Sequence, residues 1–468
     1  KTQPMGDQLV APMATTEVSM VTAKALIRRD GWETAAEDGR GRFVHSPPRN
    51  ARGHRRWEIT LREHREGFGF GEMAYSYCME ILEKGGLEMA ALHSYLCLLV
   101  TQQEDPGSRF EVRGDDLLED LGYGNARGGK EGSRRSDYLK RIASTAFLLD
   151  GVQCAGQSRN YVTGERAQMA GVQGGGGRVW TIDYRTVGEA QLSLPLSDSA
   201  VNHGTITDLR LIVTPGTWVE FQRARDGGHL LYVPFDPRIL RLGRYKQELA
   251  YRIGSLLGME ARIRWNRGYA NVGVRNLLEE AGMGSAIEKA LRDRQAAYAL
   301  RQKWNQALVT LQNMVGFRFE FPPDHYPEAL IPEELRPPEM GDPGPIYKAL
   351  EDLLAARLVI HFPEAVATTL QRALPAQERK ALAQARREKP EKRQQAERKP
   401  NGTILKEAIE RAKAAGWITG RREAAKRLGI REGQLSRLEN CYPGYPLPEP
   451  LLRNYLALLE TLNPKRRG

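Results

Sequence analysis

The feature that most constrains the fold of this 468-residue chain is an internal repeat with a period of about 160 residues. Its two copies have identical spacing: Val112, Leu117, Leu118, Glu119 and Gly122 in the first, and Val272, Leu277, Leu278, Glu279 and Gly282 in the second. Self-similarity over a long period indicates duplicated structural units, so the repeat predicts two copies of one domain. A helix that ends on glycine produces part of this pattern as well, and a shared helix ending is therefore the alternative.

The elements predicted around each copy follow one order. A helix comes first (Tyr95–Val100; Tyr251–Leu257), then a strand (Phe110–Val112; Ala261–Trp265), the short helix of the repeat and a long basic helix. In the first copy the long helix spans Ser133 to Leu149, and a hairpin follows from Val152–Cys154 and Arg178–Tyr184, with Gly171–Gly177 as its flexible tip. In the second copy it ends near Met314, before the strand-like Phe317–Phe321. This order is that of a winged helix-turn-helix.

A winged helix presents its long helix to the major groove of DNA, so polar side chains on the two long helices are the predicted contacts. In the first copy these are Ser133, Arg134, Arg135, Tyr138, Lys140 and Arg141. In the second copy they are Arg292, Arg294, Arg301, Lys303, Asn305 and Gln306.

A second motif lies between Arg421 and Asn440. Ala425, Gly429 and Leu435 stand where a two-helix DNA-binding motif needs a small residue at the helix crossing, a turn glycine and an apolar anchor. Leu428, Ile430 and Leu438 supply the apolar face, and helices are predicted on both sides at Thr403–Ala415 and Pro448–Leu459. The segment resembles the helix-turn-helix of the lambda-repressor and Cro type.

That resemblance implies that the second helix of the motif enters the major groove. Its polar residues become the predicted base or phosphate contacts: Arg431, Glu432, Gln434, Ser436 and Arg437. Arg421 and Arg422 begin the bracing helix, where contact with phosphates is expected. Ordinary surface charge is the alternative interpretation of these two residues.

Tandem winged helices over Met73–Phe321 resemble the replication initiators of iteron-type plasmids, although the appended helix-turn-helix departs from their two-domain plan. The resemblance implies binding to origin repeats and recruitment of the host helicase or its loader. In that family dimers repress their own promoter while monomers open the origin, so a homodimer is expected too. A transcriptional repressor and a partition or structural DNA adaptor are the rival interpretations.

Composition agrees with a polyanionic partner, since the net charge is +11 and the isoelectric point is near 9.4. There is no apolar run of membrane-spanning length and no secretory pattern at the N-terminus, which predicts a cytoplasmic protein without membrane contact. The four cysteines, Cys78, Cys97, Cys154 and Cys441, are widely spaced, so they predict reduced thiols rather than a zinc site or disulfides.

Catalysis is not expected from the motifs. Gly124, Gly129 and Lys130 match a phosphate-binding loop, but Glu131 occupies the place of the hydroxyl that binds magnesium. The His-x-His of rolling-circle nicking and the His-x-x-Arg of tyrosine recombination are both missing from the sequence. The sequence therefore predicts a non-enzymatic protein without metal or cofactor.

The predicted architecture is mainly α, with α+β winged-helix units. Its segments are a partly disordered N-terminal extension (1–72), winged helices at 73–190 and 210–322, a small extension (323–374) containing a helix at Tyr347–Ala356 and a strand at Leu358–Phe362, a charged linker (375–400), and an all-α helix-turn-helix domain (401–462).

Overall fold

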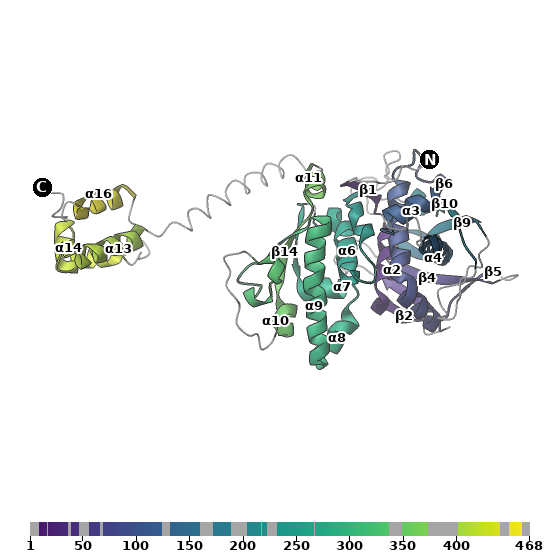
Figure 1. The fold of residues 1–468 in the computed structure, drawn as a ribbon, viewed down its shortest axis with the longest axis horizontal. Coiled ribbons are helices and arrows are strands. Elements are labelled where there is room, and N and C mark those ends of the chain that lie inside the picture. Colours follow the sequence, from purple (N-terminus) through teal and green to yellow (C-terminus); the bar gives the residue numbers. More distant parts are fainter. Residues whose placement is uncertain are drawn as a thin grey trace. The chain divides into compact units, whose positions relative to one another are not determined.

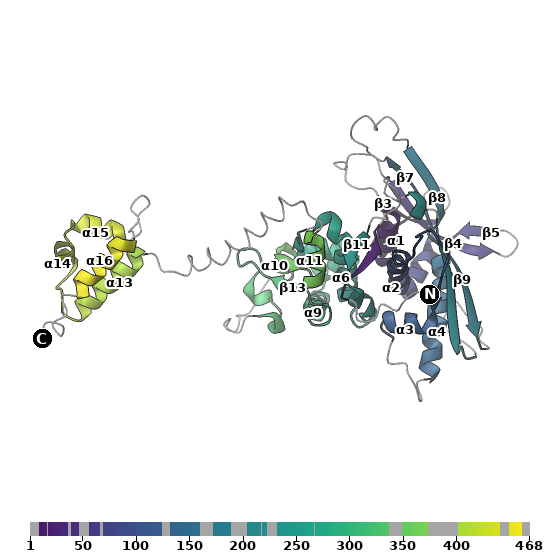
Figure 2. The same cartoon turned by 90° about the horizontal axis from the view of Figure 1, so that it is seen from above.

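The protein is described here by a computed structural model, which has a mixed α+β fold in which helix predominates (Figures 1 and 2). The chain divides into two compact units, Lys1–Leu374 and Pro375–Gly468. The structure describes residues 9–15, 17–35, 39–45, 56–65, 69–123, 132–159, 172–188, 204–216, 218–221, 232–265, 267–336, 349–372, 401–439 and 449–460.

The first repeat copy belongs to a helix-and-sheet half of the larger unit. Its elements are α2 (Tyr75–Val100), β6 (Phe110–Arg113), α3 (Gly114–Asp120), α4 (Gly132–Asp150), β9 (Trp180–Val187) and β10 (Asp208–Pro215). The strands form an antiparallel sheet in the order β6–β10–β9, and α3 and α4 pack on it. From Met89 to Val100 every side chain of α2 is buried, so this helix is the centre of the core.

The second copy lies in a half with a similar element order, which has three helices after the first strand where the first half has two. Its elements are α6 (Glu248–Arg264), β12 (Tyr269–Gly273), α7 (Val274–Glu280), α8 (Gly284–Arg292), α9 (Arg294–Thr310), the π-helical turn η5 (Leu311–Val315), β13 (Arg318–Glu320) and β14 (Arg357–His361). The sheet order is β12–β14–β13, so in both halves the last strand lies between the other two. The helices α10 (Ala349–Ala355) and α11 (Glu364–Arg372) flank β14 in sequence.

Both copies of the repeat mark the same local structure. Each is a strand that runs directly into a short helix, and each helix ends on a glycine with positive φ, +79° at Gly122 and +76° at Gly282. The residue after each glycine donates its backbone N–H to the carbonyl five residues back: Tyr123 to Leu118 at 2.7 Å, and Met283 to Leu278 at 2.9 Å. This is the hydrogen bonding of a Schellman helix ending. The glycines are therefore required because a side chain is strained at this φ.

Several predicted boundaries are wrong, because the central strand of each sheet comes from later in the chain than expected. Strand β10 lies beyond 190 and completes the first sheet, while β14 lies within 323–374 and completes the second. Ala261 lies in helix α6, and the strand there is β12 instead. The glycines at 172–177 are part of strand β8 (Val172–Arg178), which pairs with β7 (Val152–Arg159), whereas β9 pairs with β10.

The expectation of low order for 1–72 is also wrong for its described residues. Strand β1 (Ala11–Ala14) pairs with β11 (Tyr232–Phe235), and helix α1 (Glu17–Ile27) packs against both α2 and α6. The other elements are η1 (Arg29–Gly31), β2 (Trp32–Thr34), β3 (Gly41–His45), β4 (Arg56–Arg65) and β5 (Gly69–Glu72). The four strands among them join β7 and β8 in one sheet. Its strand order is β2–β3–β4–β7–β8, and β5 pairs with β4. Apolar residues of α1 complete the core, which explains why the described part of this segment is ordered.

The remaining short elements of the larger unit are α5 (Trp218–Phe221), η4 (Pro237–Arg241), η6 (Glu328–Leu330) and η7 (Glu333–Leu335). The smaller unit consists of α13 (Asn401–Ala414), α14 (Arg421–Arg427), α15 (Glu432–Glu439) and α16 (Glu449–Glu460). Its core includes Ala425, Leu428 and Leu435, and the turn glycine Gly429 has φ +70°. The four helices predicted for this segment are all present. The charged linker 375–400 lies outside the described residues.

A buried histidine fixes α1 and β9 to the centre of α2. The Nε1–H of Trp180 donates to His93 Nδ1 at 2.8 Å, and His93 Nε2 lies 2.8 Å from the carbonyl oxygen of Ser19. Since Nδ1 accepts, Nε2 carries the proton, and the neutral ring has both nitrogens satisfied. Burial lowers the pKa of His93 to about 4, from an ordinary value of 6.5.

We expect this histidine to make the larger unit acid-labile. Between pH 6.5 and about 4 the unfolded chain binds a proton that folded His93 does not, so the free energy of unfolding falls as the pH falls across this window. The total loss should be roughly 3 kcal/mol. Urea unfolding at pH 7.5, 5.5 and 4.5 measures it. The His93→Gln variant should be less stable at pH 7.5 but less sensitive to acid, and an unchanged pH slope in that variant would exclude His93 as the source.

Candidate nucleic-acid interface

Helix α9 has one buried face and one exposed polar face. Leu300, Trp304, Ala307 and Leu308 are buried, and the Nε1–H of Trp304 donates to the hydroxyl of Tyr326 at 3.2 Å. The exposed residues include Arg294, Gln295, Tyr298, Ala299, Gln302, Lys303 and Gln306. From Arg294 to Val315 the sequence contains no acidic residue. Within the helix this face therefore offers cations and amides, and the nearest carboxylate in the sequence is that of the N-cap residue Asp293.

The DNA contacts predicted for the second copy lie on α9, except for Arg292, which is the last residue of α8. Arg292, Arg294, Lys303 and Gln306 are exposed, and the three cations among them form no ion pair with any described residue. Arg301 and Asn305 are half-buried, and the guanidinium of Arg301 lies 5.5 Å from the ring centre of Tyr298. Sequence reasoning missed Gln295, Tyr298 and Gln302, which the helical period relative to buried Trp304 would have placed on the same face.

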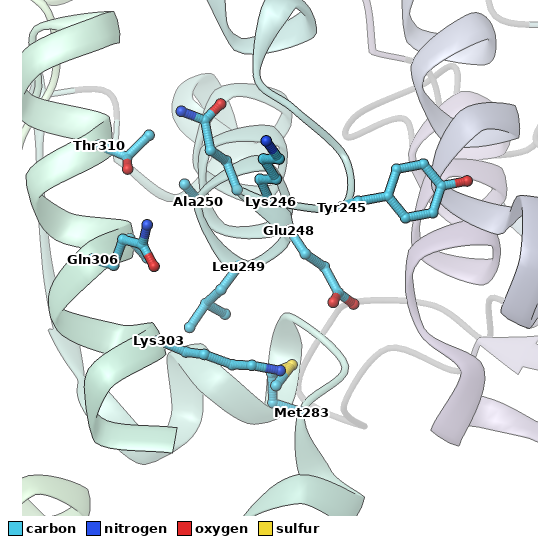
Figure 3. Close-up of a pocket in the computed structure, with 11 residues that line it drawn as sticks. Tyr245, Lys246, Glu248, Leu249, Ala250, Met283, Lys303, Gln306 and Thr310 are labelled. Atoms are coloured by element: carbon cyan, nitrogen blue, oxygen red, sulfur yellow. The ribbon is translucent and has the colours of Figure 1, made fainter. Parts of the chain in front are cut away.

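A small hollow lies beside the C-terminal half of α9. Residues from the start of α6, Met283 and α9 line it, and Figure 3 shows Lys303 extending from α9 toward Met283, with Gln306 and Thr310 on the same helix. Its volume is about 60 Å³. Because small-molecule sites usually exceed roughly 300 Å³, this hollow does not fit a nucleotide cofactor.

Helix α4 differs from α9, and this corrects the prediction for the first copy. From Leu139 to Leu149 the only exposed side chain in this described stretch is Phe147, because α2, α3, β9 and β10 all pack against the helix. Lys140 is 3% exposed, so its predicted contact with DNA is wrong. Tyr138 is half-buried with its ring centre 4.7 Å from that of Tyr123.

The two arginines of α4 whose side chains are described are engaged within the protein. Arg135 donates to Asp115 at 2.6 Å and to the carbonyl of Thr207 at 2.5 Å. Arg141 pairs with Glu88 at 3.0 Å and lies 4.7 Å from the ring centre of Tyr245. Both therefore hold the fold together rather than forming a free cationic face. The side chains of Ser133 and Arg134 lie outside the described residues.

Glu88 is the centre of a buried charge cluster between the two halves of the larger unit. Its carboxylate accepts from Arg244 Nε at 2.7 Å and also from the hydroxyl of Tyr123. Burial alone would raise the pKa of Glu88, but the charges of Arg244 and Arg141 outweigh it and hold that pKa below its ordinary value. Arg244 also donates to the carbonyls of Leu240 and Leu121, at 2.9 and 2.8 Å. The cluster thus ties α2 and α4 to the segment before α6.

In the smaller unit, helix α15 has an exposed N-terminal turn. Arg431, Glu432 and Gln434 are exposed, and Ser436 is half-buried. Arg421 and Arg422 are exposed at the start of α14. Gln434 Oε1 accepts the backbone N–H of Arg431 at 3.0 Å, which caps the helix. The side chain of Arg437 lies outside the described residues.

The loop of Gly124, Gly129 and Lys130 also lies outside the described residues, as does Cys441. Cys78, Cys97 and Cys154 are buried free thiols, and burial raises the pKa of Cys154 to about 12. Within the described residues no three His, Cys, Asp or Glu side chains gather into a metal-binding group. Among the same residues, no helix combines the length and the apolar character needed to cross a bilayer.

Comparison of the chain with protein-family models, with curated proteins and with solved structures finds no match.

Proposed function

We propose that this chain is a sequence-specific double-stranded DNA-binding protein that inserts α9 and α15 into major grooves. The single observation that carries the proposal is the exposed face of α9, where cations that form no ion pair with any described residue flank amide side chains, and where Arg294–Thr310 contains no acidic residue. Such a face suits a helix in the major groove, where base edges lie between two rows of phosphates.

Each half of the larger unit is, in this proposal, a winged helix. The support is the shared order of a helix, a strand, a group of helices and two sheet strands, with the last strand central in the sheet. The group of helices is α3 and α4 in the first half, and α7, α8 and α9 in the second. The two winged helices have different roles, because α4 is buried and α9 is exposed. The first half is a scaffold that holds the second, and the second half reads DNA.

The smaller unit is the second reader, as a helix-turn-helix of the lambda-repressor and Cro type. The support is a buried small residue at the helix crossing (Ala425), a turn glycine with positive φ (Gly429) and a buried anchor (Leu435). The N-terminal turn of α15 supplies the groove contacts, and Arg421 and Arg422 of α14 contact phosphates.

The biological role we propose is initiation of plasmid or phage replication at origin repeats. Footprinting of the full chain on DNA beside its own gene, compared with a variant ending at Leu374, tests it. Several protected direct repeats, partly retained by the truncated protein, are the expected result. A single protected palindrome that is lost on truncation would instead indicate a transcriptional repressor. Failure of a plasmid lacking only this gene to replicate would separate an initiator from a DNA adaptor.

A further inference from the structure

Three glutamines form a line along the exposed face of α9. At 3.6 residues per turn, Gln295, Gln302 and Gln306 lie within roughly 40° of arc on the helix surface. All three are exposed, and none of their side-chain amides is hydrogen-bonded to a described residue. Ala299 is exposed between them and has only a methyl group, so it leaves room for the backbone of α9 to approach a partner closely.

Cations lie on both sides of this line. Arg301 and Lys303 are each about 100° away from Gln302 around the helix, in opposite directions. A helix in the major groove has base edges directly in front of it and a phosphate strand on either side. The amides therefore occupy the position of base-reading groups, and the two cations occupy the positions of phosphate contacts.

We propose that α9 reads adenines in the major groove through Gln302 and Gln306, with Gln295 reading a third adenine nearer the start of the helix. The inference rests on the proposed function. A carboxamide donates to adenine N7 and accepts from adenine N6, whereas guanine is read best by arginine or lysine, and cytosine by a carboxylate. The polar side chains at the centre of this face are all amides, which selects adenine.

The helix geometry also sets the spacing of these adenines. Gln302 and Gln306 are about 6 Å apart along the helix, and Gln295 and Gln302 about 10 Å. With base pairs about 3.4 Å apart, an α-helix that follows the groove places the first pair of contacts about two base pairs apart and the second about three. The expected site therefore has three adenines within about six base pairs.

Selection of binding sites from random double-stranded DNA, using the full chain, tests the proposal. The wild-type protein should enrich a site with adenines at this spacing. Gln302→Arg should change one of them to guanine, with a reversal of roughly tenfold or more in preference at that position, and Gln306→Arg should do so at a different position. Gln102→Arg, the same substitution at an exposed glutamine after α2, is the matched control and should leave the site unchanged.

The outcomes separate the two proposals. If the wild-type protein enriches a defined site but both α9 variants select that same site unchanged, adenine reading by α9 is wrong while sequence-specific DNA binding stands. If the wild-type protein enriches no site at all, the proposed function is wrong and the inference falls with it. A wild-type site without adenines at the α9-dependent positions would overturn the inference alone.

Discussion

Replacing Glu88 with glutamine is expected to lower the free energy of unfolding of the larger unit by about 3–5 kcal/mol. Glutamine keeps the size of the side chain but removes the charge that faces Arg244 and Arg141. Arg244 is only 4% exposed in its side chain, so it cannot turn to water when the carboxylate is lost. An unpaired buried guanidinium lowers the free energy of unfolding by far more than an intact pair raises it. This asymmetry sets the size of the effect.

Urea denaturation at pH 7.5, monitored by tryptophan fluorescence, measures this change. Glu83→Gln is the matched control, because Glu83 lies on the same helix and pairs with Arg29 but is 71% exposed. Exposed ion pairs contribute about 0–1 kcal/mol, so this control should change little. Equal effects of the two substitutions would show that the buried cluster does not hold the two halves together.

Removing two cations from α9 is expected to cause the largest loss of DNA affinity. For the Arg294→Ala, Lys303→Ala double variant, the slope of log affinity against log salt should decrease in magnitude by about 1.8, because each lost phosphate contact contributes about 0.9. At near-physiological salt the affinity should fall roughly 10- to 100-fold. The reason is that neither side chain has an acidic partner among the described residues, so both charges are available to phosphates.

Fluorescence anisotropy with a labelled duplex from the footprinted region, at about 50–300 mM salt (about 14 to 6 Å of screening length), gives both quantities. Arg113→Ala with Arg185→Ala is the matched control, since these exposed arginines lie on strands β6 and β9, on either side of Arg210 in the first sheet. This control should retain the wild-type salt slope. If the salt slope decreases only in the control variant, the phosphate contacts belong to the first half, and the proposed role of α9 is contradicted.

The sequence predicted the elements whose residues carry a local physical requirement. Gly122 and Gly282 end their helices with positive φ, and the spacing before them reflects the same strand-to-helix junction, so the duplication could be found without a structure. The helices of the C-terminal unit were likewise predictable, because Ala425, Gly429 and Leu435 each satisfy a steric condition within one short segment.

Long-range pairing was not predictable from the sequence. Strand β14 lies far from β12 in the chain, and nothing in its five residues specifies that partner. Burial of Lys140 was hidden for a related reason, since a lysine near the start of a basic helix looks the same in sequence whether solvent or a neighbouring sheet covers it. The strand pairing of β1 with β11 shares this cause, because no local pattern connects such distant segments.

That last pairing bears on how the protein is made. Strand β1 and its partner β11 are separated by about 220 residues of chain, so at 5–20 residues per second a ribosome needs about 10–45 seconds to supply the partner after β1 has been synthesised. During this time β1 has no strand to pair with and α1 lacks its contacts with α6, although both elements can already pack on α2. We therefore expect the larger unit to complete its folding late in synthesis or after release, with its N-terminal segment a natural substrate for chaperones in the interval.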